Sequence, residues 1–290
     1  ITYAVGDDAD KSGACPSGMT SGYESYTDAY VPKPDIPRLE GEKDDDYRRR
    51  VATEIRGNPD LKNLCINPEL GEPNPSFKTV VGADMPVDGI DLDGENSQGS
   101  GQCPHHDFRG RNGEAGVDNQ FWRAVGCSEA FQSVGQGGGF DIEMHTGAWG
   151  ILITLSDLDD IQNDDDVTLG FYANNDPIQL SPSREPLPYA TYAIEQNPEF
   201  RSTTKGRIKN GVLTTDPMDI RIHSVTNSIR LQRYMKDAVL QLTLDEEGNL
   251  DGYLAGYSDV EILYDQEYGF RSGTDGTGKP ADMRLRTGSA

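Results

Sequence analysis

The chain has 290 residues, of which 34% are apolar, which suffices for one large β domain or two smaller ones. It carries 26 basic and 49 acidic residues, a net charge of −23. Phosphate backbones and anionic lipid surfaces would be repelled by this charge, which argues against nucleic-acid binding and favours divalent cations or basic partners. No apolar run approaches the roughly 20 residues that a membrane-spanning helix needs.

The four cysteines are Cys15, Cys65, Cys103 and Cys127. Their even number, wide spacing and lack of a C-x-x-C motif predict two disulfides rather than a zinc site or a redox dithiol. Of the three possible pairings, Cys15–Cys65 with Cys103–Cys127 is favoured, because each pair then lies within one segment. Disulfides predict a periplasmic or extracellular location, and a first residue other than Met favours a processed N-terminus.

The first 42 residues predict an irregular arm, because their acidic, glycine and proline runs are typical of turns and polyproline segments. Such an arm could wrap a neighbouring subunit. Residues 44–56 predict a helix, with three aspartates at the N-terminal end where the helix dipole favours negative charge. Tyr47, Val51 and Ile55 recur every four residues and form an apolar stripe that we expect to pack in a core.

A loop-rich segment follows up to residue 138, and its acidic clusters predict calcium sites. Calcium binds six to eight oxygens, which glycine-punctuated loops such as VDGIDLDGENS at 87–97 supply. The loop does not match the EF-hand pattern, and an ordinary solvated acidic turn is the alternative. A further acidic run at 157–166 is a weaker candidate. The predicted calcium ligands are Asp88, Asp91, Asp93, Glu95, Asp107, Asp118 and Asn119.

Two adjacent histidines, His105 and His106, give an alternative metal site. Imidazoles near carboxylates can bind zinc, copper or iron. In this alternative the Cys103 thiolate joins the site and Cys127 is left unpaired. Nucleophile-elbow, zinc-protease and P-loop motifs do not occur in the sequence, so no catalytic residue is predicted.

From residue 139 onward, short apolar runs with period-two alternation predict about eight strands. Asn210-Gly211 predicts a tight type I′ hairpin turn. Strands joined by short turns without intervening helices predict a mainly β fold, an antiparallel β-sandwich or jelly roll, with a sheet closed on itself as the alternative. The predicted domains are an arm at 1–42, a segment with short helices, disulfides and calcium loops at 43–138, and the β domain at 139–290.

Several stretches resemble a family of uncharacterised bacterial proteins that are predicted to be secreted. The matching stretches are CPSGM, VDGIDLDG, GVDNQFWRAVGC, NDDDVTLGFY and GRIKNGVLTT. The resemblance implies an exported protein and no particular activity.

These observations predict an exported, non-enzymatic β protein that is stabilised by calcium and acts in binding or assembly. The expected partner is another protein, further copies of the chain, or a glycan. One alternative is a periplasmic metalloenzyme or redox subunit with a transition metal at His105 and His106. The other is a calcium-dependent carbohydrate-active enzyme with paired acids.

Overall fold

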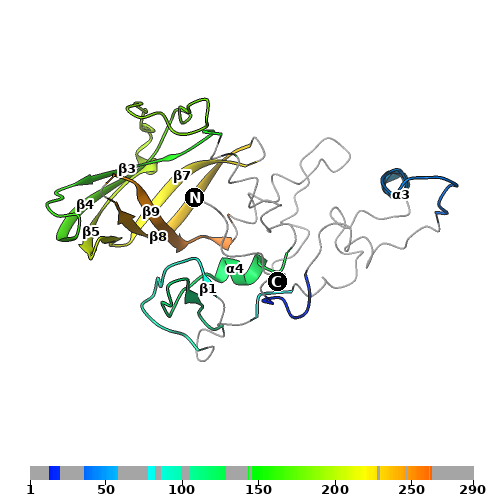
Figure 1. Cartoon of the computed structure of the whole chain (residues 1–290), viewed down its shortest axis with the longest axis horizontal. Coiled ribbons are helices and arrows are strands. Elements are labelled where there is room, and N and C mark those ends of the chain that lie inside the picture. The colour runs from blue at the N-terminus through cyan, green and yellow to red at the C-terminus, as the bar shows by residue number, and fades with distance from the viewer. Residues whose placement is uncertain are drawn as a thin grey trace. The chain divides into compact units, whose positions relative to one another are not determined.

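The computed structural model of the chain describes residues 13–19, 36–57, 78–81, 86–98, 105–128, 143, 146–226, 229–245, 247–260 and 262 (Figure 1). Most of the predicted arm and of the predicted strand at 140–146 lies outside these residues, as do Cys65 and Cys103. The chain divides into two units, Ile1–Met19 with Lys78–Leu263, and Thr20–Phe77 with Tyr264–Ala290.

Seven strands of the first unit form one antiparallel sheet, which confirms the prediction of a mainly β, antiparallel fold (Figure 1). The ladder order is β3-β4-β5-β6-β8-β7, and β9 also pairs with β8. A 3₁₀ turn, η3, at Pro198–Phe200 leads into β5. The strands are β3 (Ile151–Ser156), β4 (Asn163–Ala173), β5 (Arg201–Lys209), β6 (Val212–Thr215), β7 (Met218–Thr226), β8 (Ile229–Leu244) and β9 (Leu250–Tyr257).

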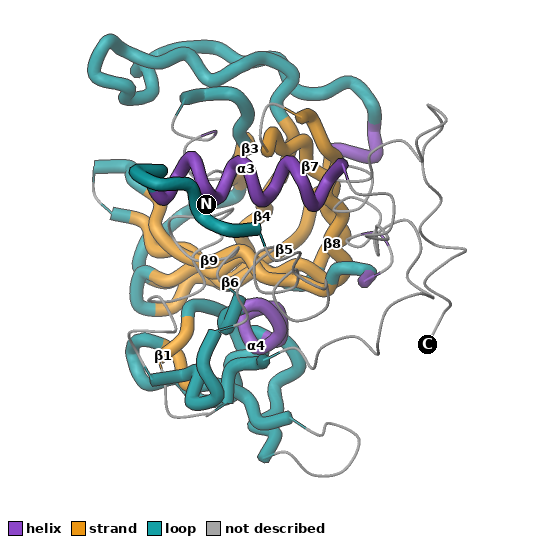
Figure 2. Tube along the Cα trace, turned by 90° about the vertical axis from the view of Figure 1, so that its right-hand side faces the viewer, coloured by secondary structure: helices purple, strands orange, loops and turns teal. Residues whose placement is uncertain are grey.

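Strand β8 accounts for the strong curvature of this sheet. Its first half pairs with β7 and its second half pairs with β6 on one side and β9 on the other. Irregular registers interrupt the β7–β8 and β8–β9 ladders, and such bulges bend strands and increase their twist. As a result β7 contacts β4, which is not its neighbour in the ladder, and the sheet folds back over its own core (Figure 2).

The main core follows from the alternation that the sequence shows. On β4, Val167, Leu169 and Phe171 are at most 1% exposed, since alternate residues of a strand point to the same face. Side chains from β5 to β8 and Trp149 complete the same apolar cluster. The predicted Asn210-Gly211 turn is confirmed, because both residues have positive φ angles, 52° and 79°.

A smaller apolar cluster lies in the segment before the sheet, where the short helix α4 (Gln120–Val125) and the two-residue strands β1 (Pro86–Val87) and β2 (Arg109–Gly110) occur. The cluster is built from Ala14, Val80, Val87, Phe108, Val117, Trp122 and Cys127. It is too small to hold a segment of this length by apolar burial alone, so the other contacts of this region matter for its order.

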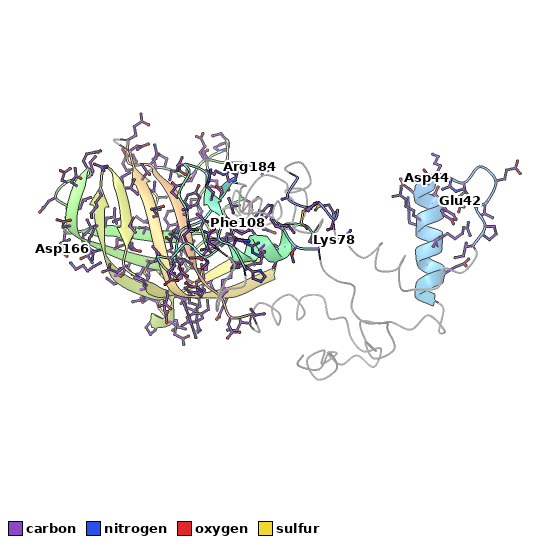
Figure 3. All side chains as sticks on the ribbon, turned by 90° about the horizontal axis from the view of Figure 1, so that it is seen from below. Glu42, Asp44, Lys78, Phe108, Asp166 and Arg184 are labelled. Atoms are coloured by element: carbon purple, nitrogen blue, oxygen red, sulfur yellow. A yellow bond between two sulfur atoms is a disulfide. The ribbon has the colours of Figure 1, made fainter. Side chains whose placement is uncertain are left out.

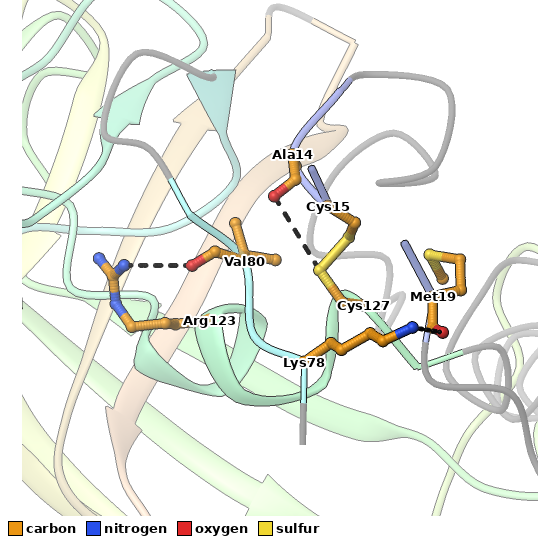
Figure 4. The surroundings of a disulfide bond; sticks show 7 residues. All are labelled: Ala14, Cys15, Met19, Lys78, Val80, Arg123 and Cys127. Atoms are coloured by element: carbon orange, nitrogen blue, oxygen red, sulfur yellow. Dashed lines mark hydrogen bonds between the residues drawn. A yellow bond between two sulfur atoms is a disulfide. The ribbon is translucent and has the colours of Figure 1, made fainter. Parts of the chain in front are cut away.

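A disulfide joins Cys15 to Cys127 across 112 residues, with a Cα–Cα distance of 5.7 Å (Figure 4). The favoured pairings Cys15–Cys65 and Cys103–Cys127 are therefore wrong. Residues near Cys15 join the small cluster through buried Ala14, whose carbonyl oxygen accepts a hydrogen bond from the amide of Val81. This long-range packing brings the two sulfurs together, which proximity in the sequence does not reveal.

In the second unit the structure describes helix α3, Asp44–Gly57, which confirms the predicted helix (Figure 3). The Arg50 guanidinium binds both carboxylate oxygens of Glu42, each at 2.8 Å. Within the described residues, Tyr47 lies against Arg38 and Arg50, whose guanidinium carbons are 4.8 and 5.6 Å from its ring centroid. None of the described helices is long and apolar enough to cross a membrane.

Candidate metal centre

Three carboxylates converge beside the small cluster. One oxygen each from Asp91, Asp93 and Asp118 lies within 4.8 Å of the other two. The first two side chains are exposed, whereas Asp118 is half-buried. The amide of Asp118 donates to the carbonyl of Ile90 at 3.2 Å, which ties the 86–98 loop to the strand-like segment before α4.

Backbone amides fix the orientation of all three carboxylates. The bonds run from Gly94 N to Asp91 Oδ1 (2.7 Å), from Glu95 N to Asp93 Oδ1 (2.8 Å) and from Leu92 N to Asp118 Oδ2 (2.8 Å). In each case the second oxygen has no hydrogen-bond partner among the described residues. The amides therefore hold each carboxylate in place and leave one oxygen of each available to a cation.

Gly116 allows the chain to come close to this loop. Its φ is +83°, and a Cβ at this position would lie 2.7 Å from the carbonyl oxygen of Glu95 and 2.9 Å from Asp91 Oδ2. A larger residue would push these two oxygens apart. Because Gly116 has no side chain, the Glu95 carbonyl oxygen and the Asp91 carboxylate can both lie close to its Cα.

Asp107 places a fourth carboxylate in the interior near this cluster. It is 4% exposed, its Oδ2 accepts a hydrogen bond from the Ser97 amide, and its Oδ1 has no partner. Burial raises the pKa of Asp118, and the charges of Asp93 and Asp107 raise this pKa further. A buried carboxylate with an open oxygen is costly unless a cation or a proton compensates its charge.

The structure gives the other predicted ligands different roles. Asp88 forms an ion pair with Arg111, with Oδ1 2.6 Å from Nε. Asn119 caps α4 by accepting a hydrogen bond from the Trp122 amide at 2.9 Å. The Glu95 carboxylate does not belong to the converging group, and the backbone carbonyl of this residue lies beside Gly116.

Two tyrosines of β9, Tyr253 and Tyr257, lie beside the acidic loop, and the sequence does not indicate this proximity. The Tyr253 hydroxyl donates to Asp88 Oδ1 at 3.0 Å, across 165 residues of sequence. Burial raises the pKa of Tyr257, and the charges of Asp118 and Asp93 add to this effect. Since no local pattern links β9 to the loop, only the fold reveals that the loop packs against the sheet.

His105 and His106 are both exposed, and neither belongs to a metal-binding group within the part of the chain that the structure describes. The alternative of a transition-metal site required an unpaired Cys127, and this requirement is not met, because the Cys127 sulfur is in the disulfide with Cys15. Cys103, the third proposed ligand of that site, lies outside the described residues.

The acidic run at 157–166 is stabilised by the protein itself. Asp164 accepts hydrogen bonds from the amides of Asp159 and Asp166, which lower its pKa. Lys205 Nζ lies 2.7 Å from Asp166 Oδ1. These contacts explain the run without a metal ion.

The donors at Asp91, Asp93 and Asp118 are all oxygens, which suits a hard cation such as calcium or magnesium better than zinc or copper.

Comparison of the chain with protein-family models, with curated proteins and with solved structures gives no match.

Proposed function

We propose that the chain is an exported β protein in which calcium orders the 86–118 segment, and that it acts by binding or assembly rather than by catalysis. The observation that carries the calcium proposal is the convergence of Asp91, Asp93 and Asp118 next to the buried, half-satisfied carboxylate of Asp107. Like charges this close repel one another, and a divalent cation would turn that repulsion into attraction.

Calcium fits this site better than magnesium. Calcium accepts irregular sets of carboxylate and carbonyl oxygens, whereas magnesium demands a near-octahedral arrangement and retains its water. The site offers carboxylates at positions 91, 93 and 118 on an irregular backbone. We therefore expect calcium to bind, with water completing its coordination.

Export is supported by the Cys15–Cys127 disulfide, because disulfides persist in oxidising compartments. The resemblance of the sequence to predicted-secreted proteins also supports export.

A role in binding or assembly is supported by the position of the site. The acidic loop packs on β9 through Asp88 and Tyr253, so a cation there would order a surface. The partner is a protein, a second copy or a glycan.

The test is thermal unfolding of the wild type and of Asp118→Asn, each with calcium and with chelator. A ligand at about 100 times its dissociation constant stabilises the folded state by about 2.7 kcal/mol, so the wild type should melt several degrees higher in calcium. Asp118→Asn should lose this calcium-dependent rise in melting temperature. The control variant Asp165→Asn removes an exposed carboxylate from the 157–166 run, and its melting temperature should still rise in calcium.

The samples in chelator give a second check, because without calcium the effect of Asp118→Asn on stability should have the opposite sign. The pKa of Asp118 is raised on folding, so its contribution to stability falls as the pH rises from its unfolded pKa through its folded pKa. At neutral pH without calcium, Asp118→Asn should therefore be at least as stable as the wild type. A wild type with the same melting temperature in calcium and in chelator would contradict the proposal.

A further inference from the structure

Strand β3 forms one end of the ladder and, in the described part of the chain, pairs only with β4. Its six residues, Ile-Leu-Ile-Thr-Leu-Ser, contain no charge and no proline. The chain as a whole is 26% charged, so this is an unusually apolar stretch for an edge. Natural proteins commonly protect edge strands with charges, prolines or bulges, because an open edge pairs readily with another strand.

The core is incompletely covered at this edge. Ile151, Ile153 and Leu155 pack against the main cluster but remain partly exposed. Their direct partners on β4 are Ala173, Phe171 and Leu169, which are at most 1% exposed. The side chains of β3 are more exposed than those of β4 because β4 has a neighbouring strand on each side, whereas β3 has one neighbouring strand among the described residues. A further strand beyond β3 would bury the remaining apolar surface.

The other edges of the sheet differ from β3. Strand β7, at the far end of the ladder, carries the charged residues Asp219 and Arg221. Strand β9 pairs with β8 alone among the described strands. It contains Asp251 and two glycines, Gly252 and Gly256, which weaken strand pairing. Its Tyr253 is bonded to Asp88 of the acidic loop. Of these three edges, only β3 combines continuous pairing with an uncharged, apolar sequence.

We propose that β3 pairs antiparallel with β3 of a second copy of the chain, around a two-fold axis at Ile153. This register places Ile153 opposite its own equivalent and Ile151 opposite Leu155. All three apolar side chains then continue the core face across the interface, which the period-two alternation of strands requires. A symmetric, self-complementary contact of this kind closes as a dimer.

Charge selects the antiparallel arrangement over the parallel one. The acidic turn that begins at Asp157 directly follows β3. In the proposed register the two copies of Asp157 are eight residues apart along the strands, about 27 Å at about 3.4 Å per residue. Salt screens charges over about 8 Å, so this repulsion is weak. Parallel pairing would place the two acidic turns side by side.

The inference rests on the assembly role proposed above and gives it a surface and a partner, but it does not involve the metal centre. Thr154 is exposed on the outer face of β3. In the proposed dimer the two Thr154 residues are diagonal neighbours, about 7–8 Å apart. Thr154→Lys would therefore place two like charges at the interface without changing the core.

The experiment is sedimentation equilibrium over a concentration series in physiological salt. Wild type should be a dimer, and Thr154→Lys should dissociate at least about tenfold more readily, since one charge on an edge strand disfavours pairing. Thr203→Lys, an exposed position on the internal strand β5, should dimerise like the wild type. Circular dichroism and melting temperature verify that both variants fold.

A strictly monomeric wild type, or a Thr154→Lys variant that dimerises as well as the wild type, would overturn the inference. The same series in calcium and in chelator separates the two proposals. A monomer that calcium stabilises overturns the dimer and leaves the metal centre intact. A dimer that Thr154→Lys disrupts, in a protein with no thermal response to calcium, supports the dimer and contradicts the metal centre.

Discussion

The sheet and the segment that precedes it are stabilised in different ways. The sheet encloses an apolar cluster to which β4, β5, β6, β7 and β8 all contribute. The 78–128 segment has a smaller cluster and depends on a disulfide, a capped short helix and charged hydrogen bonds. The comparison shows that one chain can combine a region stabilised by burial with one stabilised by specific polar and covalent links.

Arg123 illustrates the second kind of stabilisation. It is buried, stacks on Phe108 at 4.4 Å, and donates a hydrogen bond to the carbonyl oxygen of His106. A charged group in this position connects α4 to the segments around Val80 and His106, because Nη1 also donates to the Val80 carbonyl oxygen at 3.5 Å. An apolar side chain of the same size would leave the carbonyl without this donor, which is costly when the group is buried.

The largest expected effect is in the sheet. Phe171→Ala removes a side chain that is 1% exposed and should reduce the free energy of unfolding by about 3–5 kcal/mol. Tyr172→Ala, on the opposite face of the same strand, should cost less than half as much. Chemical denaturation measures both. Equal losses would show that the sheet is not stabilised by one buried face.

Removal of the disulfide should have a somewhat smaller effect, confined to the preceding segment. Cys15→Ser with Cys127→Ser opens a link across 112 residues and should cost about 2–4 kcal/mol. Trp122 belongs to the small cluster and Trp149 to the main one, so fluorescence can separate the two regions.

In a Trp122→Phe background, tryptophan emission comes from Trp149 alone, and its unfolding transition should be the same with and without the disulfide. With both tryptophans present, the protein without the disulfide should show a change in emission at a lower denaturant concentration than the protein that has it. A parallel change of the Trp149 signal would contradict the separation of the two regions.

The smallest expected effect is in the second unit, at the start of α3. The hydrogen bonds from Arg50 lower the pKa of Glu42 from 4.5 to about 2. The stabilisation from this pair is therefore present above the unfolded pKa and is lost as the pH falls from about 4.5 through about 2. Carbon NMR of the Glu42 carboxyl group measures this directly. Arg50→Gln should raise the Glu42 pKa toward its usual value, although the Leu39 amide and Arg38 still lower it, whereas Arg49→Gln should leave it unchanged.

Much of the sheet could be predicted from the sequence, because its signals are local. Alternation on β4, the continuous apolar run of β3 and the Asn210-Gly211 turn each involve neighbouring residues. Helix α3 was predicted from its four-residue apolar spacing and its acidic N-terminal end. The curvature of this single sheet was predicted only through the alternative of a sheet closed on itself, since the bulges in the β7–β8 and β8–β9 ladders leave no clear mark in composition.

The candidate metal centre was predicted only in part. The cluster at Asp91 and Asp93 was visible as a run, and Asp118 was named from a second run. Their convergence, the burial of Asp107 and the contact of Tyr253 with Asp88 depend on tertiary packing. The disulfide pairing failed for the same reason, because distance along the chain does not measure distance in the fold.

The most direct test of the central claim is the metal content of protein isolated without chelator, measured by elemental mass spectrometry for the wild type and Asp118→Asn. We predict about one calcium per wild-type chain, a substantial loss in the variant, and no stoichiometric transition metal. Wild-type protein without calcium, or with one zinc, copper or iron per chain, would contradict the account.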